Sequence, residues 1–222
     1  DELLREAQSG ERGLSWMYDG DVHYGLFHGA SGVALLLTYL GRATNEERYL
    51  AAAHDALRFD LAHAQPIENG LGVSWPYRAG FPGVLLPYWA YGSAGVGAAL
   101  LRVAHLGGAD DLAPWLDRIF VDTDRAWSVT PGMANGLAGI ASFLLDAHAF
   151  TGEQRYRDAA LCAVDGILTY RVEREAGLAL PGDYSGRIAC DYATGSAGVL
   201  RVVDRLVRGG PADFFLDEYF GT

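Results

Sequence analysis

The chain contains 222 residues, half of them hydrophobic and a fifth charged, so it is long and apolar enough to bury a sizeable core. Its 17 basic residues are all arginine, and with 28 acidic residues they give a formal net charge of −11. An acidic chain without dense arginine runs offers no basic face for phosphates, which argues against nucleic acid as a partner. Cys162 and Cys190 stand far apart without metal-ligand spacing, so we expect packed free thiols in a cytoplasmic protein.

One uncharged stretch has a length that is compatible with a membrane span. No charge occurs from Ala79 to Leu101, but Pro82, Pro87 and several glycines interrupt this stretch. Such breakers leave backbone groups without hydrogen-bond partners in lipid. We therefore expect a buried loop followed by a buried helix, and no membrane partner.

A glycine motif recurs four times along the chain and opens an apolar run each time. The motif is Gly-x-Ser/Ala-Gly followed by Val or Ile, and its copies begin at Gly29, Gly92, Gly136 and Gly195. Most of these runs are apolar nearly all round, which is typical of helices buried on most sides. We predict inner helices over residues 32–40, 95–106, 139–150 and 198–207.

Two of the intervening segments have the pattern of amphipathic surface helices. Thr44-Asn-Glu-Glu47 and Thr151-Gly-Glu-Gln154 both have the form of a capping box, and apolar residues follow each at helical spacing. A shift that places His28 on Asn135 also places the first box on the second without a gap. This register indicates an internal repeat of one inner and one outer helix.

Four such units of roughly 50 residues nearly fill the chain, which predicts an all-α architecture of helical hairpins. Two stretches, residues 65–87 and 178–191, are rich in Pro and Gly and are predicted to be irregular. Short strands are expected at residues 177–180.

The residue before the first glycine of each motif is polar. These equivalent residues are His28, Tyr91, Asn135 and Thr194. In a closed ring of hairpins the starts of the inner helices converge, so we expect the four side chains to line one mouth.

Taken together, the motifs resemble the LanC-like cyclase domain. The segments that carry the resemblance are Gly25–Gly32, Leu86–Gly95, Pro131–Gly139, and Leu180–Asp183 with Asp191–Gly198. The similarity extends from about Gly25 to Val207. It is strongest to the C-terminal cyclase domain of class III lanthipeptide synthetases, in which a Pro-Gly-Asp/Glu loop and an Asp-x-Ala-Thr-Gly motif recur.

The resemblance implies an α/α toroid of inner and outer helices, with residues 1–222 forming a single cyclase domain or its C-terminal part. About four of the family's helical hairpins are then present, and the lyase and kinase domains of the same synthetase are not. It also implies that cysteine thiols are added to dehydroalanine or dehydrobutyrine in a ribosomally made precursor peptide. The product is a lanthionine or labionin ring.

The chain departs from the zinc-dependent members at the metal ligands. Those members carry Trp-Cys-Tyr-Gly and Cys-His-Gly at the second and third motifs, whereas this chain has Trp89-Ala90-Tyr91-Gly92 and Ala134-Asn135-Gly136. Alanine supplies no ligand and Asn alone cannot hold the metal. We therefore expect no zinc, as in the class III relatives, and no other cofactor.

Thiol addition without zinc needs a general base, because a free thiol with a pKa near 8.5 is only a few per cent ionised at neutral pH. His28 is the one residue at the four equivalent positions that can act as that base, and a helix start is expected to keep its ring neutral. Tyr91 is the candidate proton donor to the enolate, and Asp183 and Asp191 are candidates because their motifs resemble class III. The resemblance and the equivalent positions assign Asn135, Thr194 and Trp89 to substrate binding.

Two other functions remain open at this point. If thiols add to the dehydro residues without catalysis, the domain is a noncatalytic scaffold that binds the peptide. A carbohydrate-active toroid would need paired carboxylates, and no acidic pair occurs on the repeated loops. The remaining histidines, His23 among them, lie outside the motifs and are expected to have surface or packing roles.

Overall fold

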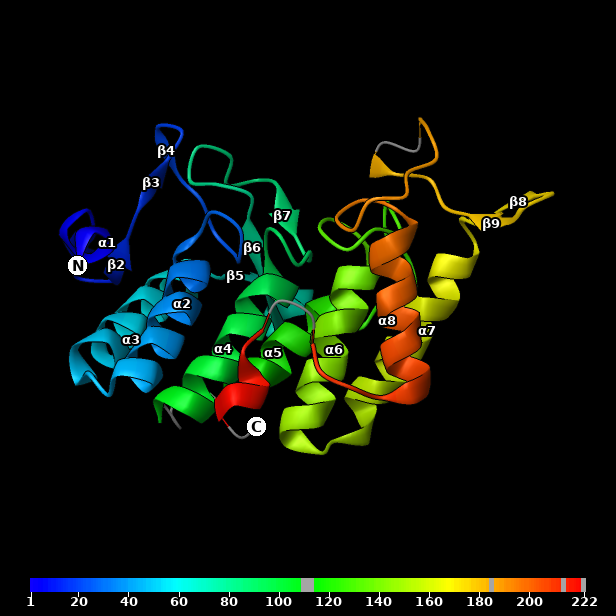
Figure 1. Cartoon of the computed structure of the whole chain (residues 1–222). Helices are drawn as coiled ribbons and strands as arrows, with labels where there is room; N and C mark the ends of the chain where they lie inside the picture. Colours follow the sequence, from blue (N-terminus) through cyan, green and yellow to red (C-terminus); the bar gives the residue numbers. More distant parts are fainter. Residues whose placement is uncertain (109–113, 184–185, 213–214, 221–222) are drawn as a thin grey trace. The chain divides into compact units, whose positions relative to one another are not determined.

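The computed structural model describes residues 1–108, 114–183, 186–212 and 215–220 (Figure 1). The chain forms two compact units. The first unit comprises Asp1–Asp122 together with the segment from Leu216 to the C-terminus, and the second comprises Thr123–Phe215.

In the first unit, α2 packs against α3 and α4. The helices of this unit are α1 (Glu2–Arg5), α2 (Ala30–Thr44), α3 (Glu47–Ala62), α4 (Ser93–Gly107) and α5 (Pro114–Thr123, at the boundary). Glu68–Gly70 and Asp217–Phe220 form short 3-10 helices.

The first unit also contains small antiparallel sheets, so the chain is mostly helical but not purely all-α as predicted. β1 (Gln8–Gly10) pairs with β2 (Gly13–Ser15), β3 (Met17–Tyr18) with β4 (Asp21–Val22), and β5 (Gln65–Ile67), β6 (Gly72–Pro76) and β7 (Leu85–Leu86) form a three-stranded sheet. β6 is buried at every position, so it lacks the alternation of polar and apolar residues that marks a half-buried strand. The β3–β4 and β6–β7 segments lie at the N-terminal ends of α2 and α4 (Figure 1).

The second unit is built on α6 (Leu137–Thr151), which packs against both α7 (Gln154–Leu168) and α8 (Ser196–Arg208). A hairpin of β8 (Val172–Arg174) and β9 (Gly177–Ala179) follows α7. β9 confirms the short strand predicted at residues 177–180.

Helices are present at all four predicted places, as α2, α4, α6 and α8. Each begins about two residues before the predicted start, because the first helical turn already includes the middle of the glycine motif. α4 and α6 are buried along most of their length, as their continuous apolar runs predict. The segment before α4 is different, since residues 79–84 are exposed and the expected buried loop is wrong there.

The two capping boxes are not formed. Thr44 and Thr151 are the last residues of α2 and α6, and their hydroxyls donate to the carbonyl four residues earlier at 2.8 and 2.6 Å. Asn45 and Gly152 then adopt left-handed backbone conformations that end these helices. Threonine bonds back to its own helix as readily as it caps the next one, which is why the motif misleads.

The internal repeat is nevertheless present in the outer helices. At the start of α3, Arg48 pairs with Glu46 at 2.7 Å and donates to the hydroxyl of Tyr49 at 2.8 Å. At the start of α7, Arg155 pairs with the glutamate two residues before it at 2.9 Å and donates to the tyrosine directly after it at 3.1 Å. The same arrangement of glutamate, arginine and tyrosine therefore occurs at equivalent places in both units.

The last glycine of the motif is required by close packing. A Cβ on Gly32, Gly95 or Gly198 would lie 2.0, 2.1 or 2.0 Å from a backbone carbonyl oxygen of the loop before it. No side chain fits at that distance, so the repeated glycine lets each loop lie directly on the first turn of its helix.

We expect Gly32→Ala to lower the free energy of unfolding by about 1–3 kcal/mol, because the backbone of the loop must move to admit the methyl group. The matched control is Gly83→Ala, since a Cβ at Gly83 meets nothing within 4 Å. Urea unfolding of both variants tests this. Equal stability of the two variants would contradict the packing argument.

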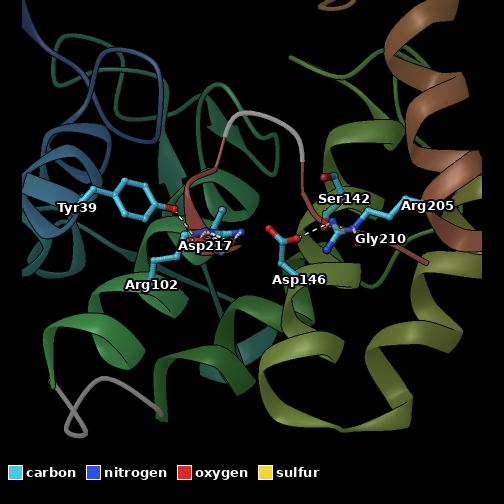
Figure 2. A network of polar contacts seen from close by, with 8 residues as sticks. Tyr39, Arg102, Ser142, Asp146, Arg205, Gly210 and Asp217 are labelled. Atoms are coloured by element: carbon cyan, nitrogen blue, oxygen red, sulfur yellow. Dashed lines mark hydrogen bonds and ion pairs between the residues drawn. The ribbon is translucent and has the colours of Figure 1, made fainter. Parts of the chain in front are cut away.

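Each unit contains an arginine–aspartate pair with one buried partner (Figure 2). In the first unit, Asp217 binds the fully buried Arg102, with the closest contact at 2.7 Å, and accepts from the Tyr39 hydroxyl at 2.6 Å. In the second unit, Arg205 pairs with buried Asp146 at 2.6 Å. These pairs connect α2 and α4 to the C-terminal 3-10 helix, and α6 to α8.

Both cysteines are exposed, so the expectation of packed thiols is wrong. Cys162 lies on α7, whose buried face is formed by residues such as Ala159 and Ala163. Among the residues that the structure describes, no helix combines the length and apolar character needed to cross a bilayer.

Candidate functional site

The loops that precede the inner helices are joined in pairs by equivalent backbone hydrogen bonds. The Phe27 amide donates to the Ala90 carbonyl at 3.1 Å, and the Ala134 amide donates to the Ala193 carbonyl at 2.7 Å. These four residues occupy the same place in their motifs, one position before the predicted polar residue. Within each unit, two of the predicted site residues are therefore brought to neighbouring loops.

The loop that carries His28 is held at both ends by one buried carboxylate. Oδ2 of Asp60, at the end of α3, accepts from the Gly25 amide at 3.2 Å, the Ser31 amide at 3.0 Å and the Ser31 hydroxyl at 2.5 Å. Burial raises the pKa of Asp60 to about 7, although these hydrogen bonds lower it. Asp60 fixes the loop on which His28 stands, and nothing in the sequence indicated this role.

His28 is half-buried and lies among aromatic rings. Its imidazole stacks on Tyr18 with ring centroids 4.0 Å apart and an angle of 6° between the planes, and the Tyr91 ring lies 5.6 Å away. Burial lowers the pKa of His28 below its ordinary value, and His23 lowers it further. A neutral imidazole at neutral pH is the form that accepts a proton.

Tyr91 keeps its proton in this environment. Burial raises the pKa of Tyr91 to about 12, and the neighbouring Tyr77, whose ring lies 4.8 Å away, raises it as well. A phenol of this kind is a hydrogen-bond donor at neutral pH. Trp89, predicted to bind substrate, is buried and packs edge-on against Phe27 at 5.5 Å.

The predicted residues of the second unit form a separate group. Asp191 accepts from the Thr194 amide at 2.7 Å and from its hydroxyl at 2.9 Å, and these bonds lower the pKa of Asp191. Its carboxylate thus orders its own loop. A pocket of about 490 Å³ lies beside Thr194 and is lined by Gly182, Asp183, Gly186, Arg187, Ala189 and Thr194.

Asp183 is the predicted residue of this group that has an unsatisfied atom. Its Oδ1 is buried and has no hydrogen-bond partner among the described residues. Asn135 accepts a hydrogen bond from Thr130 through its backbone carbonyl at 2.7 Å. The mouth shared by all four motif loops stays a prediction.

Three aromatic residues around His28 were missed by the sequence reasoning. Tyr18 comes from β3, His23 directly follows β4, and Tyr77 directly follows β6. They stand on short hairpins outside the repeat, so no equivalence of motifs pointed to them. The proximity of His23 to His28 in the sequence was the available signal.

The donor set does not fit a tetrahedral zinc ion. The positions where the resemblance places the zinc ligands hold Ala90, Ala134 and Asn135, and alanine has no donor atom. Within the described ranges, no three His, Cys, Asp or Glu side chains gather closely enough to bind a metal.

The repeated glycine loops and the helices that they open are those of a known class of protein. The chain belongs to the lanthionine synthetase C-like family, whose family model matches residues 2–119. The matched region contains the first two motif loops, with His28 and Tyr91.

One curated relative extends the similarity into the second unit. The chain is 29% identical over 197 residues to the "Probable SapB synthase" of Streptomyces coelicolor. The aligned part covers 87% of this chain and 20% of the relative, so the chain spans about a fifth of that protein's length.

Proposed function

We propose that the chain is a zinc-independent lanthipeptide cyclase domain that adds cysteine thiols to dehydroalanine or dehydrobutyrine in a precursor peptide. The observation that carries this proposal is the pairing of His28 with Tyr91 on neighbouring motif loops of a LanC-like protein, 5.6 Å apart. One residue accepts protons at neutral pH and the other donates hydrogen bonds. The similarity to a synthase supports a peptide substrate.

The reaction needs two proton transfers and no redox partner. His28 takes the proton of the cysteine thiol, and the thiolate attacks the β-carbon of the dehydro residue, so that a carbon–sulfur bond forms and the carbon–carbon double bond becomes an enolate. Tyr91 donates a hydrogen bond to the enolate oxygen, where negative charge develops. The α-carbon then takes up a proton, which His28 returns.

The proposal extends to fold and context. The chain is proposed to have the α/α toroid fold that the family implies. The precursor peptide and the lyase and kinase domains of a class III synthetase are the proposed partners. The pocket at Asp183 and the loop of Asp191 are assigned to the same reaction.

The test is a cyclisation assay with a peptide that contains dehydroalanine and a free cysteine. We expect free thiol to be lost faster with the protein than without it. Alkylation of the remaining thiol and mass spectrometry measure this loss. A metal chelator should leave the acceleration unchanged. A rate equal to that without protein would overturn the proposal in favour of a noncatalytic scaffold.

A further inference from the structure

His23 is a buried imidazole at the centre of the aromatic cluster around His28. The side chain is 4% exposed. Tyr18, His28 and Tyr77 contact it with ring centroids at 5.6, 5.9 and 5.4 Å and planes at 79°, 73° and 87°. Edge-to-face contact on several sides holds the ring in one orientation.

Neither ring nitrogen of His23 has a hydrogen-bond partner among the described residues. A neutral imidazole always has one nitrogen that accepts, and leaving a buried polar atom unsatisfied is costly. Burying His23 therefore lowers the stability of the fold, whereas a phenylalanine at the same place would have no polar atom to leave unsatisfied.

The groups that face His23 come from each element packed around it. Tyr18, Tyr77 and Tyr91 are the phenol rings that face it, and the Tyr91 ring lies 6.4 Å away. The charged neighbours Asp21 and Arg78 pair with each other at 3.6 Å. His28 is thus the titrating neighbour in direct ring contact with His23.

We propose that His23 is a positioning residue for His28: it holds the His28 ring by edge-to-face contact in the aromatic cluster, and its imidazole disfavours a positive charge on His28. The inference rests on the proposed function of His28 as the base. Two positive charges at this separation repel each other, and burial of the His23 ring reduces the screening by water.

The interaction with His23 widens the pH range in which His28 is neutral. Repulsion from His23 adds to burial in lowering the pKa of His28. His28 then stays neutral, and able to take a thiol proton, at a lower pH than an isolated histidine. Because the sites interact, the midpoints that are measured belong to the pair.

The test is a proton NMR titration of the histidine Cε1 protons in the 222-residue chain between pH 4.5 and 8.5, a range that spans the ordinary histidine pKa. In His23→Phe and His23→Gln, the His28 midpoint should rise by about 0.5–1 pH unit, because the like charge is gone and burial remains. The two variants differ in polarity and shape but both lack the titrating proton, so they should agree. Tyr77→Phe, which changes a neighbouring ring without removing a charge, should leave the midpoint in place, and His105 serves as the internal reference.

An unchanged His28 midpoint in both His23→Phe and His23→Gln would make His23 a packing residue and overturn the inference. The NMR result does not depend on activity, so it separates this inference from the proposed function. If the protein is a cyclase, the acidic limb of its pH–rate profile should also move upward in His23→Gln.

Discussion

Asp217→Ala is expected to lower the free energy of unfolding by about 3–5 kcal/mol, because it removes a carboxylate that pairs with a fully buried guanidinium. Nε of Arg102 donates to both carboxylate oxygens at 3.1 Å, and Nη2 donates to Oδ2 at 2.7 Å (Figure 2). The Arg102 side chain has no exposed surface, so water cannot replace Asp217 without opening the fold. Guanidinium chloride unfolding measures the effect.

Two comparisons separate the buried pair from a general loss of charge. Glu173 pairs with Arg171 at 3.6 Å on the surface, so Glu173→Ala should cost about 0–1 kcal/mol. Replacing both partners, as Arg102→Met with Asp217→Leu, should recover much of the loss, because the guanidinium is then removed together with the carboxylate.

Amide hydrogen exchange of Asp217→Ala would show which helices lose stability. Asp217 also accepts from Tyr39 of α2, so amides of α2 and α4 should exchange faster in Asp217→Ala. A free energy of unfolding within about 1 kcal/mol of that of the unaltered protein would mean that Arg102 is satisfied without Asp217.

The inner helices were predictable because several signals agree in them. Each begins at a glycine motif and continues as a long apolar run, and a run of that length with no alternation is helical. The predicted starts of the helices were about two residues late, because the two residues between the glycines of the motif already belong to the first turn.

The strands of the first unit were not predictable by the same reasoning. β3, β4 and β7 contain two residues each, too few for an alternation pattern, and β6 is buried throughout. The glycine motifs that mark the repeat do not extend into these hairpins, which were predicted to be irregular or were not assigned.

The proximity of His28 to Tyr91 was predictable from their equivalent positions in the repeat. The contacts that surround this pair were not. Asp60 lies on Ile167 when the repeat is superimposed, and both residues are buried, so the second unit has an apolar side chain where the first has its carboxylate anchor. Asp217 reaches Arg102 across more than half the chain, and no local pattern records such a contact.

His28→Asn is expected to slow cyclisation by at least about tenfold at neutral pH, the lower end of the loss when a general base is removed and water partly replaces it. Asparagine is the residue at the aligned position of the third motif, Asn135, so the loop is compatible with it. Asp60 holds this loop through Gly25 and Ser31, not through the imidazole, and the fold should therefore survive.

The matched control is His105→Asn, which removes an exposed histidine of α4 far from the motif loop in sequence. Its cyclisation rate should equal that of the unaltered protein. Circular dichroism and the unfolding midpoint of both variants show whether the fold is retained.

The pH dependence gives the stronger test of the assignment. The pKa of His28 is lowered by burial and by His23, so the unaltered protein should keep its full rate down to a pH below the ordinary histidine range and lose it as His28 becomes protonated. Without the base, the substrate thiol must ionise unaided, and the rate of His28→Asn should rise steadily with pH toward the thiol pKa near 8.5. The difference between the two proteins should thus be largest near neutral pH and shrink in alkaline solution. An unchanged rate and an unchanged profile in His28→Asn would remove His28 from the chemistry and leave the peptide-binding scaffold as the function of this domain.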